Sequence, residues 1–488
     1  MSKGGNQPEK EATNPSNAPD STPLFVDLDG TVIKSDLLIE GLLALVRQAP
    51  LSLFRLPFWL MRGIKQVKVE VANRVVMPIE RIPVQEEFIE FLRKEAAYGR
   101  PIYLATAANR LLAEQVADRI GVFSGVLASD ERENLKGWKK LEAIRESFPG
   151  PFDYAGNSRS DLKIWSEARS GIVVNPGPGI CEAARRRCRI AQVFEDRASS
   201  FSSWFRALRI YQWMKNLLLG VPLLTAHAFS PNELGAATVA FVAFGLVASS
   251  TYLINDLFDL GADRSHPRKR KRPFAAGDIS LKTGLAAIIA FLGIGFFLSG
   301  WLPKPFRVAL LAYAGLTLGY SSWFKTVALL DVILLAALHT VRIIAGAAAI
   351  EVEVSSWLLA FSMFVFLSIA LVKRTSELVT VGENSQTETV GRDYRLSDYA
   401  VLNAMGIASG YLSVLVLALF IDSPGVPENY THPGRLWLLC PLMLYWVSRL
   451  WIKTARGEMP DDPLLFSLKD WVSWMVLLAM VLVTLTAI

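Results

Sequence analysis

From about residue 215 to the end, the sequence is a succession of apolar stretches long enough to cross a membrane. A helix needs about 20 consecutive, mainly apolar residues to span the hydrocarbon core of a bilayer. The candidate spans are 217–232, 235–254, 283–301, 306–322, 327–348, 356–372, 399–421, 436–452 and 470–488. The first is the weakest. This pattern predicts a nine-helix, all-α transmembrane domain over 217–488, with a soluble all-helical core as the alternative.

The loops between these spans differ in charge. The cations that follow even-numbered spans are Arg264, Arg268, Lys269, Arg270, Lys271, Arg272, Lys325, Lys373, Arg374, Arg392 and Arg395. The other loops hold Glu351, Glu353 and Asp422, with Lys304, Arg307 and Arg435 as their cations. Because cytoplasmic loops are enriched in Lys and Arg, the N-terminus and the cationic loops are expected in the cytoplasm. We therefore expect an integral protein of a bacterial inner membrane.

The N-terminal part has a different composition. Residues 1–22 are polar and rich in Pro, Asn and Ser, which predicts a disordered tail without a secretory signal. Residues 23–195 are typical of a soluble α/β domain. The whole chain is 52% hydrophobic with a net charge of +6, and its three cysteines lack the spacing of a disulfide or zinc framework. We expect no nucleic-acid partner; an oligomer is possible.

Three aspartates lie just after the second candidate span, in the stretch NDLFDLGADRSHPRKRKRP. Asp256, Asp259 and Asp263 are separated by three and four residues, so a helix that continued past the span would carry them on one face. Like charges at this spacing repel, which favours a divalent cation between them. Mg²⁺ binds carboxylate oxygens and commonly a phosphate oxygen as well.

A basic run follows these acids directly and could hold phosphate groups that a metal leaves exposed. Its candidate phosphate donors are Arg264, Arg268, Lys269 and Arg272. The acids and the basic run together predict a magnesium diphosphate site at a membrane surface. A solvated loop that only sets the topology is the alternative.

This stretch resembles the first aspartate-rich motif of the UbiA superfamily of membrane-embedded prenyltransferases. The stretch QWMKN, with Lys215 and Asn216, is similar to the motif before that family's first helix. The resemblance covers about 205–488. It implies that Asn255 and the three aspartates bind Mg²⁺ and that Lys215 and Asn216 contact substrate.

The second motif departs from the family's usual pair of aspartates. It reads YSSWFKTVALLD, and the candidate substrate contacts here and beyond are Tyr320, Lys325, Asp331, Arg342, Lys373, Arg374 and Glu377. The combination is similar to the decaprenyl-phosphate phosphoribosyltransferase branch, which uses phosphoribosyl pyrophosphate (PRPP) and a polyprenyl phosphate. Extra cations suit extra phosphates. A structural ion pair for Arg342, and snorkelling to the interface for Lys373 and Arg374, are the alternatives.

The soluble part resembles the haloacid dehalogenase (HAD) superfamily. The motifs are DLDGT with Asp27 and Asp29, a strand that ends in Thr106, Lys136 in NLKGWKK, and NSRSD with Asn157 and Asp161. The resemblance implies an α/β Rossmannoid fold in which Asp27 attacks phosphorus, Asp29 is the acid and base, and Thr106 and Lys136 hold phosphoryl oxygens.

The same resemblance places Mg²⁺ on Asp27, on Asp161 and on the backbone carbonyl of Asp29, together with Asn157. Asn157 stands where the family usually has aspartate, which should weaken the metal and leaves an inactive domain as an alternative. A helical cap is expected at about 36–90 of the 23–195 domain. An interfacial linker helix is expected at 196–216, with a plain linker as the alternative.

These expectations give a transferase fused to a phosphatase. The transferase would move 5-phosphoribose from PRPP to a polyprenyl phosphate, and the HAD domain would remove the 5-phosphate. An aromatic prenyltransferase that uses a polyprenyl diphosphate is one alternative, and a non-catalytic lipid-binding scaffold is another. The prenyl chain length and the particular phosphosugar are not determined by the sequence.

Overall fold

The computed structural model describes residues 22–130, 133–195, 200–383, 393–424, 426, 430–460 and 462–487. Residues 1–21 of the predicted tail, and Arg392, lie outside the described residues. The chain divides into two compact units. The first is Met1–Ala207 with Asp256–Gly284, and the second is Leu208–Asn255 with Leu285–Ile488. From Asp256 onward, the aspartate-rich stretch therefore belongs to the same unit as the soluble domain, whereas Asn255 belongs to the second unit.

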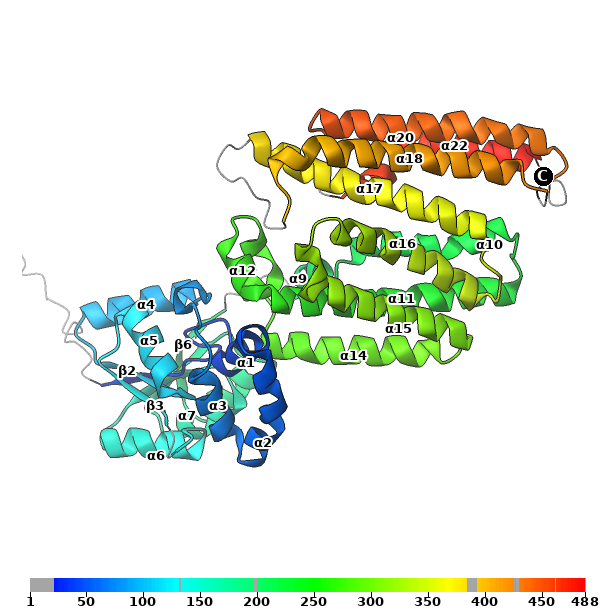
Figure 1. The fold of residues 1–488 in the computed structure, drawn as a ribbon. Helices are drawn as coiled ribbons and strands as arrows, with labels where there is room; N and C mark the ends of the chain where they lie inside the picture. Colours follow the sequence, from blue (N-terminus) through cyan, green and yellow to red (C-terminus); the bar gives the residue numbers. More distant parts are fainter. Residues whose placement is uncertain are drawn as a thin grey trace, which may run out of the picture. The chain divides into compact units, whose positions relative to one another are not determined.

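A six-stranded parallel sheet forms the centre of the first unit (Figure 1). Its strands are β1 (Leu24–Val26), β2 (Ile102–Asn109), β3 (Gly125–Ser129), β4 (Asp153–Gly156), β5 (Ser170–Val174) and β6 (Arg189–Phe194). The strand order is β3-β2-β1-β4-β5-β6. All three residues of β1 are buried, as expected of a central parallel strand covered on both faces. The predicted α/β class is thus correct for this part of the chain.

Helices pack on both faces of this sheet and close two apolar cores. They are α4 (Glu86–Ala97), α5 (Arg110–Ile120), α6 (Trp138–Ser147), α7 (Leu162–Trp165) and α8 (Ile180–Arg185). The segment expected to be a cap contains α1 (Leu37–Gln48), α2 (Leu56–Met61) and α3 (Ile64–Ala72), together with the 3-10 turns η1 (Pro50–Arg55) and η2 (Ile79–Arg81). Asp36 caps α1 by accepting from the amides of Leu38 and Ile39.

The second unit is helical, and its members pack in two apolar clusters. Its long helices are α11 (Pro231–Phe258), α14 (Leu281–Ser299), α15 (Lys304–Ser322), α16 (Leu330–Ala349), α17 (Ser356–Glu383), α18 (Tyr399–Ile421), α20 (Leu439–Ala455) and α22 (Trp471–Ala487). The first turns of α14 and the last residues of α11 belong to the first unit. Shorter elements are η4 (Ile210–Gly220), α10 (Val221–Thr225) and α21 (Pro463–Lys469).

The count of nine spans is not confirmed. Within the described residues five helices are long and apolar enough to cross a membrane, or up to six if the bent pair α21 and α22 is one span. The predicted span at 217–232 is divided between the end of η4 and the five-residue α10, followed by a break before α11. Pro222 and Pro231 start new helices there because proline is tolerated in the first turn of a helix but not in its interior.

The predicted linker helix is also broken. A helix, α9 (Ser200–Ala207), ends near Arg209, whose φ of 49° lies in the left-handed region, and η4 starts at Ile210. Left-handed backbone at a non-glycine residue cannot continue a right-handed helix. Residues 196–199 lie outside the described part of the chain.

Candidate active sites

The soluble part of the first unit has a site where the strand order of the sheet reverses. Chain connections leave β1 toward β2 on one side and reach β4 on the other, and ligands bind at the carboxyl ends of strands at such a point. Asp27 follows β1 directly, and its amide donates to the Ala155 carbonyl of β4 at 2.9 Å. Thr106 on β2 and Asn157, just after β4, flank it. The topology therefore brings together the motifs that sequence reasoning singled out.

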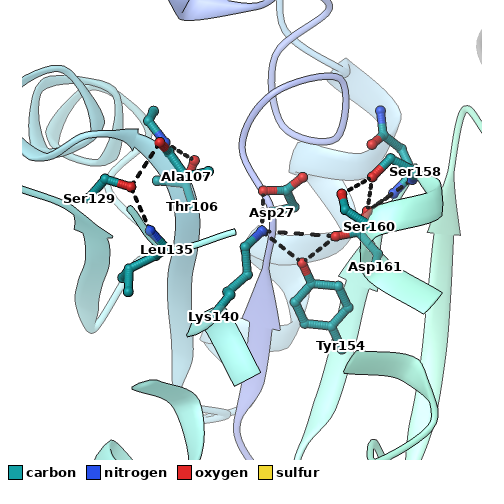
Figure 2. A network of polar contacts seen from close by, with 12 residues as sticks. Asp27, Thr106, Ala107, Ser129, Leu135, Lys140, Tyr154, Ser158, Ser160 and Asp161 are labelled. Carbon is teal, nitrogen blue, oxygen red and sulfur yellow. Dashed lines mark hydrogen bonds and ion pairs between the residues drawn. The ribbon is translucent and has the colours of Figure 1, made fainter. Parts of the chain in front are cut away.

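A buried lysine connects the two key acids of this site (Figure 2). The Lys140 ammonium donates to Asp27 Oδ1 at 2.7 Å and to the Tyr154 hydroxyl at 3.1 Å, and it lies 3.9 Å from Asp161 Oδ1. Tyr154 in turn donates to Asp161 at 2.8 Å. Burial opposes the ammonium, but the carboxylates of Asp27 and Asp161 outweigh it and raise the pKa of Lys140.

Lys140 was not predicted from the sequence, which indicated Lys136 for this role. Lys136 precedes α6, whereas Lys140 lies on the buried face of that helix with Leu141 and Ile144. The motif NLKGWKK offers three lysines, and only the helical phase of the two apolar residues distinguishes them. The position of Lys140 on the same helix face as Leu141 and Ile144 is the sequence signal that identifies it.

Asp29 has the environment of a proton donor. Burial, helped by the Asp36 carboxylate, raises the pKa of Asp29 to about 7, although the Leu37 amide donates to it at 3.0 Å. A carboxyl group that holds its proton near neutral pH can protonate a leaving oxygen and later take a proton from water. The acid and base role of Asp29 stays a prediction, with which a pKa of about 7 is compatible.

Asn157 packs tightly against the DLDGT turn. Gly30 has a φ of +80°, and a Cβ added to it would lie 2.0 Å from Asn157 Nδ2. Asp161 is fixed close by, because its Oδ2 accepts from the amides of Asn157 and Ser158 at 3.1 and 2.9 Å. The structure therefore places Asn157 beside the DLDGT turn and close to Asp161.

A second lysine, Lys68 on α3, reaches this site and was missed by sequence reasoning. Its ammonium donates to Asn134 Oδ1 at 2.9 Å and to the Ala107 carbonyl, next to the buried Thr106. Burial lowers the pKa of Lys68, opposed by the carboxylates of Asp29 and Asp36. The predicted cap segment thus contributes a polar side chain to the site.

The aspartate-rich stretch folds as two helices rather than one. The helix α11 ends at Phe258, and α12 (Leu260–Ser265) starts after Asp259. The acids still converge, because one nitrogen of Arg272 donates to Asp256 at 3.1 Å and to Asp263 at 2.8 Å. Burial raises the pKa of the Asp263 carboxyl, and Arg272 opposes this shift.

Arg264, predicted as a phosphate donor, has another partner. Its guanidinium donates to both oxygens of Glu40 on α1, at 2.6 and 3.1 Å, and both side chains are buried. The neighbouring His266 accepts from the amides of Arg268 and Lys269. Arg268 and Lys269 are exposed, whereas Arg264 contributes to the packing of α12 against α1.

The residues of both sites fit Mg²⁺ if substrate phosphate and water complete its ligands. No cluster of three or more His, Cys, Asp or Glu side chains suited to a metal occurs in the part of the chain that the structure describes. Each site offers two converging carboxylates, Asp27 with Asp161 and Asp256 with Asp263. Because Mg²⁺ commonly binds through one or two carboxylates plus substrate phosphates, this donor set suits it.

The second unit holds two buried arginines with different partners. Arg374 on α17 pairs with Asp331 of α16, donates to Glu377 at 2.7 Å and to the Tyr320 hydroxyl at 3.1 Å, and is 1% exposed. Tyr394 also donates to Asp331. Snorkelling to the interface is thus excluded for Arg374, which is instead part of a buried ion-pair network.

Arg342 of α16 has neutral partners. It donates to Asn216 Oδ1 at 3.2 Å, to the Leu338 carbonyl at 2.6 Å and to the Tyr313 hydroxyl at 3.0 Å. Its side chain also lies over the rings of Phe244 and Tyr313. Among the described residues no carboxylate pairs with it, so the structural ion pair considered from sequence is not formed.

Two buried side-chain atoms near the start of the second unit have no hydrogen-bond partner among the described residues. Asn216 Nδ2 and Gln212 Oε1 are buried without a hydrogen bond in the described part of the chain. The Lys215 ammonium donates to Asp462 at 2.6 Å. Lys325 and Lys373 are half-buried. The hydrogen bond from Arg342 to Asn216 thus joins two side chains that were predicted from separate motifs.

Comparison with known proteins agrees with these two parts. Residues 217–468 match the UbiA prenyltransferase family, and residues 24–165 match the haloacid dehalogenase-like hydrolases. The chain belongs to the UbiA prenyltransferase family and carries a HAD-like N-terminal region. Together with its apolar helices, this makes it an integral membrane protein.

Particular relatives cover one or both parts. Uncharacterized protein y4nM of Sinorhizobium fredii is 36% identical over 93% of this chain and 89% of its own length. The decaprenyl-phosphate phosphoribosyltransferase of Mycobacterium tuberculosis is 34% identical over 52% of this chain and 94% of that enzyme. The structure of a UbiA homolog from Archaeoglobus fulgidus bound to GPP and Mg²⁺ covers 58% of this chain and 99% of that one, with 18% identity and a TM-score of 0.44.

Proposed function

We propose that the chain transfers 5-phosphoribose from PRPP to a polyprenyl phosphate with release of diphosphate, and that its HAD-like domain then removes the 5-phosphate. The product would be polyprenylphosphoryl ribose. Similarity to the phosphoribosyltransferase of Mycobacterium tuberculosis over nearly all of that enzyme supports the first step. Both reactions are proposed for the cytoplasmic side of the inner membrane, because loops rich in Lys and Arg are expected on that side.

The observation that carries this proposal is the buried, unbalanced charge of Arg342. A guanidinium that is 3% exposed and bonded only to neutral described groups strongly favours an anion beside it. Asn216 touches it and has a free buried amide nitrogen that can donate to the same anion. A lipid phosphate, mostly dianionic at pH 7, balances that charge more fully than the single carboxylate of an aromatic acid.

The second motif also argues for phosphate substrates. Its single acid, Asp331, is fully buried and already paired with Arg374 and Tyr394. It is therefore poorly suited to hold a second metal and diphosphate, which is the arrangement that an isoprenoid diphosphate donor would need. This contact disfavours the aromatic prenyltransferase alternative.

In the transfer step, a lipid phosphate oxygen forms a bond to the anomeric carbon while the bond from that carbon to diphosphate breaks. The diphosphate leaves with the electron pair. The second pKa of a phosphate monoester is near 6, so the attacking group is already mostly dianionic at pH 7 and needs no strong base. Asp256 and Asp263 would hold Mg²⁺, which would neutralise the charge that develops on the leaving diphosphate, and Arg272 would donate to the diphosphate oxygens.

In the dephosphorylation step, Asp27 would attack phosphorus while Asp29 gives its proton to the departing sugar oxygen. Water, activated by the same Asp29, then hydrolyses the aspartyl phosphate and releases inorganic phosphate. Lys140 would hold the phosphoryl oxygens and offset the charges of Asp27 and Asp161. With Asn157, the metal site has one negative charge fewer than it would have with an aspartate. We therefore expect the site to bind Mg²⁺ more weakly but not to be lost.

The test uses purified full-length protein with PRPP and a polyprenyl phosphate. Diphosphate should be released with Mg²⁺, and Asp256→Asn should abolish the release. Mass spectrometry of the lipid should show polyprenylphosphoryl ribose for the wild type, and a lipid heavier by one phosphate for Asp27→Asn. Release of diphosphate from an isoprenoid diphosphate and an aromatic acid, but not from PRPP, would instead establish the alternative.

A further inference from the structure

A basic groove lies in the first unit, and its lining residues do not include Asp256, Asp259 or Asp263. It has a volume of about 590 Å³ and is formed by three parts of the chain: η2 and the start of α4, the linker helix α9, and the segment from α12 to α13 (Pro273–Ala276). Its lining residues are Arg81, Pro83, Glu86, Arg206, Arg264, Arg270, Lys271, Ala275, Ala276 and Asp278.

The lining carries an excess of positive charge. Its five cations face two carboxylates, which leaves a net charge of +3 on the groove. Asp278 is already engaged, since Arg206 donates to it at 3.2 Å. Arg264 is held by Glu40, and Arg81 donates to Ser265 at 2.5 Å.

Two cations of the groove remain available for a ligand. Arg270 and Lys271 are exposed, and within the described ranges their side chains make no hydrogen bond or ion pair. Both residues lie in the 3-10 turn η5 (Lys269–Lys271). Like charges held this close repel each other, so an anion between them would relieve the repulsion.

The groove is distinct from the proposed diphosphate site because the backbone changes direction after η5. Lys271 is the last residue of the 3-10 turn, whereas Arg272 after it is extended, with φ of −64° and ψ of 143°. Arg272 accordingly contacts Asp256 and Asp263 and does not line the groove, whereas Lys271 lines the groove. Cations of the same basic run therefore line the groove and contact the acids Asp256 and Asp263.

We propose that this groove is a binding site for a phosphate group, carried either by a lipid head group or by a phosphorylated sugar. Guanidinium and ammonium groups at the rim recognise phosphate oxygens, and the small side chains of Ala275 and Ala276 leave room for the group that bears the phosphate. The volume suits a ligand of that size. The linker helix α9 also exposes Phe201 and Phe205 beside Arg206, a mixture of rings and cations found at membrane surfaces.

The experiment measures local protection instead of turnover, so it is independent of the transfer reaction. Full-length protein carrying Asp27→Asn, which prevents hydrolysis of the probe, is placed in nanodiscs of phosphatidylcholine. Hydrogen–deuterium exchange of residues 269–276 is followed as ribose 5-phosphate is added. A second set of nanodiscs contains phosphatidylglycerol and no soluble phosphate ester.

The variant Arg270→Ala/Lys271→Ala removes the two available cations. Loss of two charge-assisted contacts should lower the affinity for the protecting ligand by about tenfold or more. The matched control is Arg93→Ala/Lys94→Ala, which removes two exposed cations of α4 that do not line the groove. The control should keep the wild-type response, and melting temperatures of both variants check that each is folded.

The two arms identify the source of the phosphate. Protection by ribose 5-phosphate in neutral nanodiscs assigns the groove to a sugar phosphate, and protection only with phosphatidylglycerol assigns it to a lipid head group. Either result supports the site if the groove variant loses it. The proposal is overturned if neither probe protects residues 269–276, or if the control variant loses protection as fully as the groove variant does.

Discussion

The buried ion pair between Glu40 and Arg264 allows a quantitative prediction. Glu40→Gln preserves the shape of the side chain but removes its charge, and it leaves a guanidinium that is only 7% exposed without a carboxylate. Removal of one partner from a buried pair costs about 3–5 kcal/mol, because the remaining charge stays desolvated. Glu40 and Arg264 join α1 to α12, so we expect the loss to appear as easier opening of α12.

Native-state hydrogen exchange measures that opening directly in the full-length protein. Since about 1.4 kcal/mol corresponds to a tenfold change in an equilibrium, amides of α12 should exchange roughly 100-fold faster or more in Glu40→Gln. The control is Lys282→Ala, which breaks the ion pair of Lys282 with Asp36 in the same unit. The Lys282 side chain is 70% exposed, and exposed pairs contribute about 0–1 kcal/mol.

A double variant separates the loss of the pair from a general loss of packing. Glu40→Leu/Arg264→Met replaces both charges by apolar groups, which is often neutral when the volume is kept. It should therefore recover much of the protection that Glu40→Gln loses. The reasoning would be refuted if Glu40→Gln changed exchange in α12 no more than Lys282→Ala does, or if the double variant were as unprotected as the sum of its single changes.

Three further predictions concern other buried charges. Lys140→Met should lower dephosphorylation at least about 100-fold and leave diphosphate release unchanged, since it removes the cation between Asp27 and Asp161; equal loss of both activities would contradict this separation. Arg374→Met should destabilise the second unit by about 3–5 kcal/mol, whereas Arg342→Met should not lower the melting temperature yet should weaken the use of polyprenyl phosphate; similar melting temperatures for the two variants would count against the difference in their partners. Hydrogen bonds from Arg169 and Ser170 hold the pKa of Asp153 below its usual 3.8 despite burial, so its contribution is complete above pH 4 and is lost as the pH falls below that value; a melting temperature of Asp153→Asn that kept a constant difference from the wild type between pH 6 and pH 3 would refute this.

The architecture of the first unit could be predicted from the sequence because its signals are local and ordered. The apolar run LFV, followed at once by DLDGT, predicts a buried parallel strand with acids at its carboxyl end, and the structure has both. Motif spacing pointed to Lys136, whereas the side chain that contacts Asp27 is that of Lys140, which the phase of the following helix places on its buried face. Local pattern thus located the site but did not select each side chain.

Contacts between distant segments were beyond the reach of the sequence. Glu40 and Arg264 are separated by 224 positions, and Arg342 and Asn216 by 126, so no periodicity connects them. The basic run HPRKRKRP looked like one phosphate-binding unit, yet its members have different partners. Which cation faces an acid and which faces the groove depends on the turn η5 and on residues of α1 and η2 that come much earlier in the chain.

The two buried arginines of the second unit show how charge balance separates structural from functional residues. Both were predicted from the sequence as substrate contacts, and both lie on apolar helices where an unpaired charge is unfavourable. Arg374 is neutralised by Asp331 and Glu377, so its burial requires no further partner. Arg342 is surrounded by an amide, a phenol and a carbonyl, which solvate the charge without cancelling it. Since hydrogen bonds alone do not offset the burial of a full charge, we propose that a ligand supplies the anion that none of the described residues supplies, and a phosphate that approaches Arg342 would gain that interaction without first breaking an ion pair.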